Sequence, residues 1–320
     1  MCCSHLLLWG GCIFADGFRA RRRRLFSAEP PQVAPGQVIT LFYRAVGPSN
    51  NGDLRSGRAQ APLPAMLAGL AAQMIQEKSL FNVPLIEVSQ QNTCPPGLAG
   101  PACLLTAVRI QIPFDISADV SRDPQSGSVT LSPVANLVLY ADGQPTADSL
   151  LQPVPDNSHV LTTCDSEGQT QAGTCGRMVF HPDGRLVSAG SPAVKTETVH
   201  VFLYGMGQTS PAATTGIAAQ PGYFLTDVLG SPRVRISFTP FVNALVSAAR
   251  HGDSSDPNEV PAAIIGATLK AGDVGIYELV ITVPPSLPFT VACGGPVRSN
   301  YSLNVITSQG VEPVAVCIGQ

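Results

Sequence analysis

Hydrophobic residues fill nearly every position from residue 38 to residue 43, which read VITLFY. β-branched and aromatic side chains favour strands, and Gly47 and Pro48 supply the turn that closes the run. A similar run, VFLYGMGQ, follows at 201–208, so that Phe202 stands 160 positions after Phe42. We therefore predict two matching strands, each buried on both faces.

Two more similarities follow in the same order along the chain. AVRIQIPFDIS at 107–117 matches YELVITVPPSLP at 277–288, with Pro113 and Pro284 at equivalent positions. Proline cannot donate a hydrogen bond to a neighbouring strand, so we expect both strands to end there. NLVLYADGQP and SLNVITSQGVEP form a third, looser pair. Three similarities in one order predict a tandem duplication.

The segment PAMLAGLAAQMIQEK at 64–78 consists of strong helix formers. The neighbouring sequences NVPLIEVS and VRIQIP are those of a β-meander, and tertiary context commonly overrides local propensity. We therefore expect this segment to be mainly β.

These similarities divide the chain into four parts. We expect a leader at 1–28, a first β-sandwich module at 29–150, a linker at 151–192 and a second β-sandwich module at 193–320. The linker is rich in Pro, Asp, Asn, Gly and Ser, and it carries the turn signal HPDGR.

The leader contains HLLLWGGCIFA, an apolar run too short to cross a bilayer and typical of the core of an export signal. Its basic residues, RARRRR, follow this core, although export signals usually place them before it. No later stretch reaches 18 consecutive apolar residues, so we expect no membrane span in the rest of the chain.

Charge excludes one class of partner. The 320 residues carry a formal net charge of -3, and only 13% of them are charged. Five of the 19 Lys and Arg residues lie in the leader together with a single acid, Asp16, which leaves 14 Lys and Arg against 21 Asp and Glu. Such an acidic body offers no basic face for phosphate backbones, so we expect no nucleic-acid partner.

Six of the nine cysteines lie outside the leader. An even number indicates disulfides and an oxidising, extracytoplasmic compartment. Six cysteines allow 15 pairings, and we favour pairing between sequential neighbours because CPPGLAGPAC and CDSEGQTQAGTC each enclose a glycine-containing loop. Zinc is the weaker alternative, since the chain has no CxxC pair. The disulfide candidates are Cys94, Cys103, Cys164, Cys175, Cys293 and Cys317.

No catalytic motif stands out. The GxSxG signature of serine hydrolases is absent, and GMG at 205–207 lacks the lysine of a phosphate-binding loop. We expect His200 to be a strand residue. The other histidines of the body, which lie in turn-like contexts, are His159, His181 and His251. We therefore expect neither catalytic residues nor a cofactor.

Two weak binding signals remain. HGDSSDPNE at 251–259 contains Asp253, Asp256 and Glu259, whose oxygens suit Ca²⁺, but its spacing is not that of an EF-hand loop and a solvated turn is favoured. Carbohydrate binding would need an exposed aromatic residue. Tyr223, in QPGYFL, is the one tyrosine of the body that lies outside an apolar strand pattern.

The ordered set of segments resembles a known family. VAPGQVITLFYRAVGP, NVPLIEVS, VRIQIPFDIS, DGRLVSAGSPA, VHVFLYGMGQTSP and DVGIYELVITVPPSLP are similar to the Solibacter-type C-terminal domain of large exported acidobacterial proteins. The match covers roughly residues 33–310. This resemblance implies secretion and an all-β chain of two tandem immunoglobulin-like β-sandwich modules, and it implies no catalytic residue.

From the sequence we expect a non-enzymatic structural or interaction module of a secreted or surface bacterial protein, with a protein or cell-surface partner. The alternative is an accessory domain that binds polysaccharide or Ca²⁺. An undetected hydrolase is the third and least favoured reading.

Overall fold

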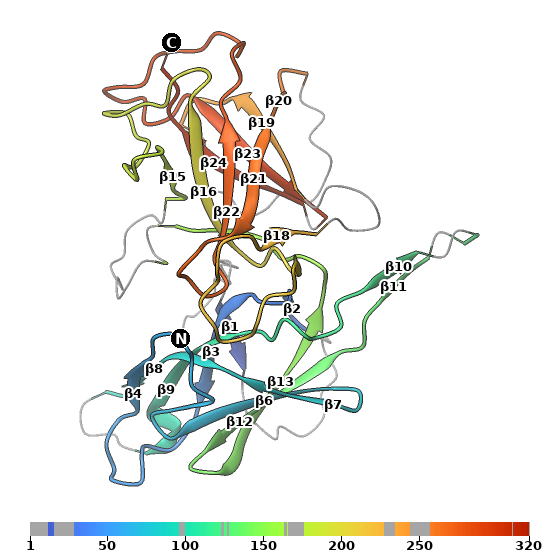
Figure 1. Cartoon of the computed structure of the whole chain (residues 1–320). Helices are drawn as coiled ribbons and strands as arrows, with labels where there is room; N and C mark the ends of the chain where they lie inside the picture. The colour runs from blue at the N-terminus through green and yellow to red at the C-terminus, as the bar shows by residue number, and fades with distance from the viewer. Residues whose placement is uncertain are drawn as a thin grey trace.

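The computed structural model describes residues 12–15, 29–95, 100–122, 125–126, 128–162, 165, 176–226, 234–243, 257–308 and 310–319 (Figure 1). Within these ranges the chain is nearly all-β. It has no α-helix and a single short 3-10 turn, η1 (Pro101–Cys103). The prediction of a β protein is therefore confirmed.

Two sheets form the N-terminal half, residues 29–153 together with one strand from the leader. The first sheet has the order β1 (Cys12–Ala15), β3 (Val38–Arg44), β9 (Leu104–Gln111), β8 (Leu85–Asn92), β4 (Ser56–Arg58). The second has the order β2 (Gln32–Val33), β13 (Gln144–Pro153), β12 (Ala135–Ala141), β6 (Leu70–Gln76), β5 (Met66–Leu67), and β7 (Ser79–Val83) also pairs with β6. A separate ribbon of β10 (Val120–Arg122) and β11 (Val129–Leu131) projects from this half (Figure 1).

Two more sheets form the C-terminal half, residues 159–319. The third sheet has the order β14 (His159–Val160), β16 (Thr198–Tyr204), β22 (Tyr277–Thr282), β21 (Ile264–Leu269), β18 (Phe224–Leu225), β17 (Thr209–Ser210), and β15 (Val179–Phe180) also pairs with β16. The fourth has the order β20 (Val260–Ala262), β19 (Arg235–Pro240), β23 (Tyr301–Thr307), β24 (Gly310–Val316).

Alternating burial explains why the helix-forming segment at 64–78 becomes strands. In β6, Leu70, Ala72 and Met74 are buried, whereas the residues between them are only partly buried or exposed. β6 also pairs on both sides, with β12 and with β7. Non-local pairing and period-2 burial thus override the helix propensity, and the prediction of β structure is confirmed.

Each half buries its own hydrophobic core between its two sheets. The first core joins side chains such as Leu41 and Ile110 of the first sheet to Leu70 and Leu137 of the second. The second core does the same for the other two sheets, and it also contains Phe114, which belongs to the N-terminal half.

The predicted strand ends are confirmed. β9 ends at Gln111 and β22 at Thr282, each two residues before its proline. The matching sequence segments also fall on strands, namely β3 with β16, β9 with β22, and β12 with β23.

The segment 151–192, expected as a linker, contributes to the sheets where it is described. β13 continues to Pro153, and β14 and β15 both pair with β16 at the edge of the third sheet. Cys164 and Cys175 lie outside the described residues.

The four other cysteines outside the leader form two disulfides between sequential neighbours, as predicted. Cys94 and Cys103 have Cα atoms 5.0 Å apart, and Cys293 and Cys317 have Cα atoms 6.1 Å apart. The first closes the loop between β8 and β9, and the second ties the loop after β22 to the end of β24.

Candidate functional site

Tyr223, the residue singled out for ligand contact, lines a cavity of about 40 Å³ between the two halves. The loop 213–220 and the segment 269–275 supply most of the wall, and Phe114 of the N-terminal half completes it. Asp273 also lines the cavity, and its carboxylate is engaged in an ion pair with Lys270. The volume corresponds to a few water molecules and is well below that of pockets that enclose small-molecule ligands.

The loop that forms this cavity is fastened to the N-terminal half by three hydrogen bonds that are donated by backbone N–H groups. The Gly216 N–H donates to Gln111 Oε1 at 2.7 Å, and the Leu63 N–H donates to the Gly216 carbonyl oxygen at 2.7 Å. The Phe114 N–H donates to Thr215 Oγ1 at 2.9 Å. Gln111 is fully buried, and its Nε2 donates to no described residue, so the junction keeps one unused donor beside Gly275.

A second group of contacts joins the halves beside the first. Arg109 Nη2 donates to Tyr204 Oη at 2.7 Å, and its guanidinium carbon lies 5.8 Å from the centre of the Tyr204 ring. Burial raises the pKa of Tyr204 despite the opposing charge of Arg109, so the phenol stays protonated at neutral pH.

Gly205 lies very close to the backbone of the connection between β13 and β14. Its φ is +75°, and a Cβ added there would lie 2.1 Å from the carbonyl oxygen of Asn157. Asn157 also accepts a hydrogen bond from Gln37 Nε2 at 3.2 Å. The GMG segment is part of the irregular connection between β16 and β17, and Gly205 lets two backbones meet without a side chain between them.

Each described histidine of the body is paired with a carboxylate, and all three pairs lie in the C-terminal half. The pairs are His159 with Asp165 at 3.1 Å, His181 with Glu197 at 2.5 Å, and His200 with Glu278 at 2.7 Å. His200 lies in β16 and Glu278 in β22, so this pair is a cross-strand contact, as expected for a strand histidine. His251 lies outside the described residues.

His181 also lies beside Ser191, so that Ser191, His181 and Glu197 are arranged like the residues of a catalytic triad. Ser191 Oγ lies 3.2 Å from His181 Nε2, while Glu197 holds Nδ1 on the other side of the ring. However, the Ser191 carbonyl oxygen also lies 3.1 Å from Nε2, and the Ser191 N–H donates to the Ser188 carbonyl oxygen.

The protonation of His181 determines whether Nε2 donates or accepts a hydrogen bond. Burial lowers the pKa of His181, but the hydrogen bonds to Glu197 and to the Ser191 carbonyl outweigh this, so the net pKa is raised. When Nε2 donates to the Ser191 carbonyl oxygen, this nitrogen has no lone pair left to accept the Ser191 proton. The arrangement therefore suits a structural clasp between the end of β15 and the start of β16.

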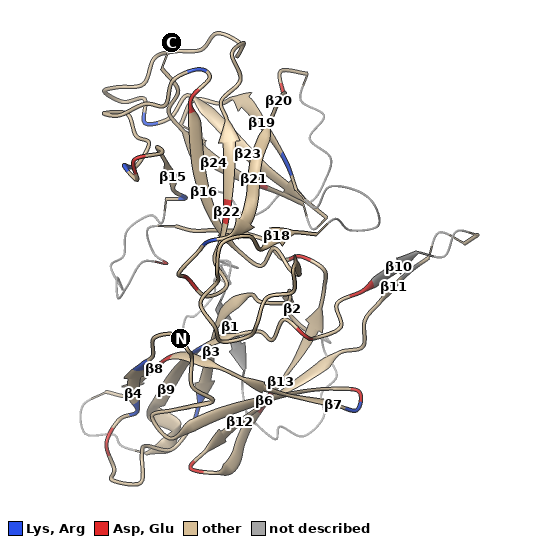
Figure 2. Cartoon of the chain, in the orientation of Figure 1, with Lys and Arg blue, Asp and Glu red and all other residues tan. Residues whose placement is uncertain are grey.

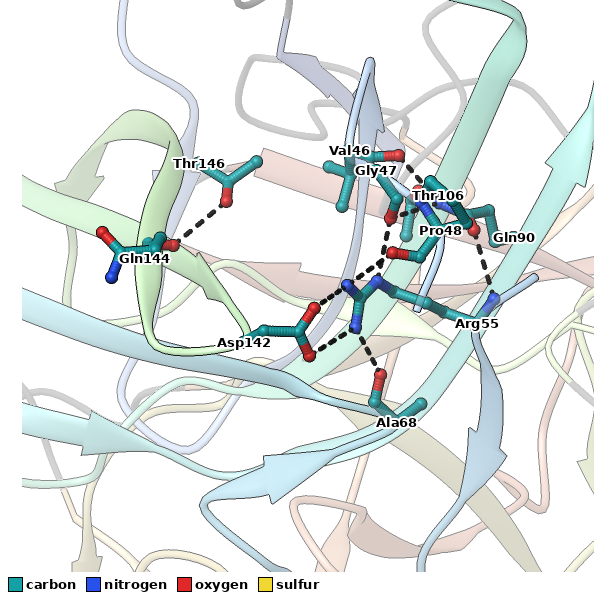
Figure 3. A network of polar contacts seen from close by, with 10 residues as sticks. All are labelled: Val46, Gly47, Pro48, Arg55, Ala68, Gln90, Thr106, Asp142, Gln144 and Thr146. Carbon is teal, nitrogen blue, oxygen red and sulfur yellow. Dashed lines mark hydrogen bonds and ion pairs between the residues drawn. The ribbon is translucent and has the colours of Figure 1, made fainter. Parts of the chain in front are cut away.

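The most buried charge of the N-terminal half is Arg55, whose side chain is 1% exposed (Figure 3). Its Nε and both Nη groups donate to the carbonyl oxygens of Gly47, Pro48 and Ala68. The two remaining donors meet the carboxylate of Asp142, at 3.3 Å from Nη1 and 2.5 Å from Nη2. This hydrogen bond from Arg55 lowers the pKa of Asp142.

All five donors of the guanidinium are satisfied within the protein, so Arg55 has none left for a ligand. The network instead ties the turn between β12 and β13 and the turn between β5 and β6 to the chain before β4. Sequence reasoning did not single out this arginine, because its partners lie up to 87 positions away.

The predicted calcium residues are not brought together in the described part of the chain. Asp253 and Asp256 lie outside the described residues, and Glu259 immediately precedes β20. Among the residues that the structure describes, no group of three or more His, Cys, Asp or Glu side chains could hold a metal ion.

No helix in the described ranges is long and apolar enough to cross a membrane. No family model, curated protein or solved structure matches the chain. Function must therefore be inferred from the geometry of this chain alone.

Proposed function

We propose that the chain is a non-enzymatic structural or interaction module of a secreted or surface bacterial protein, built from two tandem immunoglobulin-like β-sandwiches. The junction is the observation that carries this proposal, because hydrogen bonds and the side chain of Phe114 join the two halves. A rigid, two-part scaffold is what a spacer or presenting module requires.

Strand pairing supports the tandem arrangement. In the first sheet β3, β9 and β8 lie side by side, and in the third sheet β16, β22 and β21 lie side by side in the same chain order. The second sheet has the run β13, β12, β6, β7, and the fourth has β24, β23, β19, β20. Seven strands of each half therefore correspond in order and in partner.

An edge contact supports the immunoglobulin-like assignment. In the N-terminal half, β2 pairs parallel with the end of β13. In the C-terminal half, Ala193 forms a parallel bridge with Ile318, just after β24. Both halves also share the general build of an immunoglobulin-type sandwich, in which two antiparallel sheets pack face to face over a common core.

Extracytoplasmic location is supported by the two disulfides and by the apolar run in the leader. The sequence resemblance to the Solibacter-type C-terminal domain of exported proteins agrees with such a location.

Thiol mapping tests this proposal. The protein would be unfolded without reductant, alkylated with iodoacetamide and mapped by mass spectrometry. We expect Cys94, Cys103, Cys293 and Cys317 to remain unmodified, together with Cys164 and Cys175. The leader cysteines serve as the internal control for alkylation where they are retained. Alkylation of the body cysteines would contradict export.

The alternative function, polysaccharide binding, would use the partly exposed ring of Tyr223 as an aromatic platform, since the cavity that it lines is too small to enclose a sugar. On a glycan array, binding that is lost in Tyr223→Ala but kept in Phe224→Ala would support it. Phe224 is the matched control because it is the neighbouring aromatic residue and is 57% exposed. For the calcium version, EDTA would have to lower the unfolding temperature.

A further inference from the structure

The loops at the end of the C-terminal half that carries the C-terminus (Figure 1) contain exposed apolar residues. Phe289 is 87% exposed, the largest value among the exposed large hydrophobic residues described. The others at this end are Val194 at 55%, Val291 at 49%, Phe241 at 46% and Val242 at 44%. We call residues 193–196, 241–243, 284–300 and 317–319 the distal tip.

Hydrogen bonds connect the loops of the distal tip into one surface. The Phe241 N–H donates to the Asn300 carbonyl oxygen at 3.1 Å, and Asn300 Nδ2 donates to the Val291 carbonyl oxygen at 3.1 Å. Asn243 Nδ2 donates to the Pro296 carbonyl oxygen at 3.1 Å. The exposed side chains therefore belong to neighbouring loops.

The distal tip is also held rigidly, which distinguishes it from a loose loop. Tyr301 Oη donates to the Pro288 carbonyl oxygen at 2.6 Å, directly beside Phe289. The Cys293–Cys317 disulfide fastens the same loop to the end of β24, and the Ala193 N–H donates to the Cys317 carbonyl oxygen. Phe289 is thus presented on a fixed support, so little conformational entropy is lost when it binds.

The charges of the distal tip have one sign. Its only charged residues are Lys195 and Arg298, both exposed, and neither forms an ion pair with any described residue. The nearest acid in sequence, Glu197, accepts hydrogen bonds from His181 and from the Val194 N–H. In Figure 2 the loops at this end are mostly tan, in agreement with their low charge.

From these features we propose that the distal tip binds an anionic lipid surface, with Phe289 and its apolar neighbours entering the interface and Lys195 and Arg298 facing the headgroups. Interfacial binding grows with buried apolar area and with attraction between basic residues and anionic lipids. The proposal rests on the surface role proposed above and names its partner.

Two other partner classes fit the distal tip less well. Sugar sites combine an aromatic platform with polar groups that fix orientation, yet Phe289 has no polar group and the side chains of Asn243 and Asn300 are already engaged. A stable protein interface buries about 800 Å² on each partner, whereas a few protruding side chains on loops suffice to enter a lipid interface.

Tryptophan fluorescence gives a position-specific test in the full chain. Trp9→Phe removes the only native tryptophan, and Phe289→Trp then reports on the distal tip. Leu80→Trp in the same background is the matched control, because Leu80 is 60% exposed on β7 of the N-terminal half. The probes are vesicles of phosphatidylcholine alone or mixed with phosphatidylglycerol, with brominated lipid as quencher. If the leader alone bound the vesicles, Phe289→Trp and Leu80→Trp would give the same fluorescence response.

We expect a blue shift and quenching for Phe289→Trp with the mixed vesicles and neither for Leu80→Trp. Phe289→Asp should lower vesicle partitioning about tenfold or more relative to Leu80→Asp, because a charge replaces the phenylalanine that would be buried in the lipid interface. Lys195→Gln with Arg298→Gln should abolish the preference for anionic vesicles, whereas Arg44→Gln with Lys78→Gln should keep it.

Three results would overturn the proposal. The first is equal spectra for the two tryptophan positions, and the second is equal response to both vesicle compositions. The third is a wild-type dimer that Phe289→Asp dissociates in sedimentation experiments, which would assign the distal tip to contact with a second copy. None of these results alters the thiol count, so this proposal can fail while the proposed function stands.

Discussion

At the scale of the residue, two buried side chains that carry charge, Arg55 and His181, are held by several partners within the protein. Arg55 uses all five of its donors on backbone carbonyls and on Asp142, and His181 is held between Glu197 and a backbone carbonyl. A buried charge is tolerated only when such partners replace water. Both residues therefore connect turns that lie apart in the sequence.

The clasp at His181 predicts a pH dependence of stability. Because the folded pKa of His181 lies above its ordinary value of 6.5, its contribution is fully present below about pH 6.5 and is lost as the pH rises through the folded pKa. We expect the difference in unfolding free energy between wild type and His181→Gln to shrink over that range, as measured by urea unfolding at a series of pH values.

Glu197→Gln is the control for this pH profile. It removes the carboxylate that holds the histidine proton, so the same pH-dependent part should disappear. A difference between wild type and His181→Gln that stays constant across the range would show that packing, and not the charge, supplies the contribution of His181.

At the scale of the element, short segments pair with the outer edge of β16, and the chain next to them forms part of the junction between the halves. β14 and β15 have two residues each, yet together they pair with β16 along its outer edge. The turn after β16 then brings Gly205 against Asn157, just before β14. The chain around β14 therefore both covers the edge of β16 and contacts Gly205 at the junction.

Gly205→Ala is expected to destabilise the protein by about 2–4 kcal/mol, since it combines a strained positive φ with overpacking against the Asn157 carbonyl. Gly52→Ala is the matched control, because Gly52 has a φ of +82° and open space around it. Gly52→Ala should lower the unfolding free energy only by the strain of its positive φ, about 1 kcal/mol. Urea unfolding of both variants measures the difference, and equal losses would contradict the contact.

At the scale of the whole molecule, the junction joins two separate cores. Phe114 leaves the N-terminal half just after β9 and is counted among the buried residues of the second core, with 6% of its surface exposed. The backbone hydrogen bonds around Gly216 hold the same place. The halves are therefore expected to unfold as one cooperative unit.

Phe114→Ala is expected to cost about 3–5 kcal/mol of unfolding free energy, as for other buried phenylalanines. It should also split the single thermal transition into two, because the halves lose the side chain that they share. Phe289→Ala is the matched control, and with 87% exposure it should change stability by no more than about 0.5 kcal/mol. Calorimetry that shows one unchanged transition for Phe114→Ala would contradict the coupling.

The sequence by itself determined the local features of this protein. β-branched runs, alternation of apolar residues and the prolines at 113 and 284 located strands and their ends, because these preferences act over a few neighbouring residues. The two described disulfides join sequential neighbours, and the shorter of them joins Cys94 and Cys103, which are separated by only 9 positions.

Only the tertiary structure decided how distant segments meet. Nothing near Phe114 in the sequence indicates that it enters the second core, and nothing near Arg55 indicates Asp142 as its partner. The segment 64–78 became strands because β12 and β7 pair with β6, and parts of 151–192 joined the third sheet because the edge of β16 needed covering. Such contacts depend on which surfaces remain to be buried once the strands have formed, and that is a property of the assembled sheets rather than of any local stretch of residues.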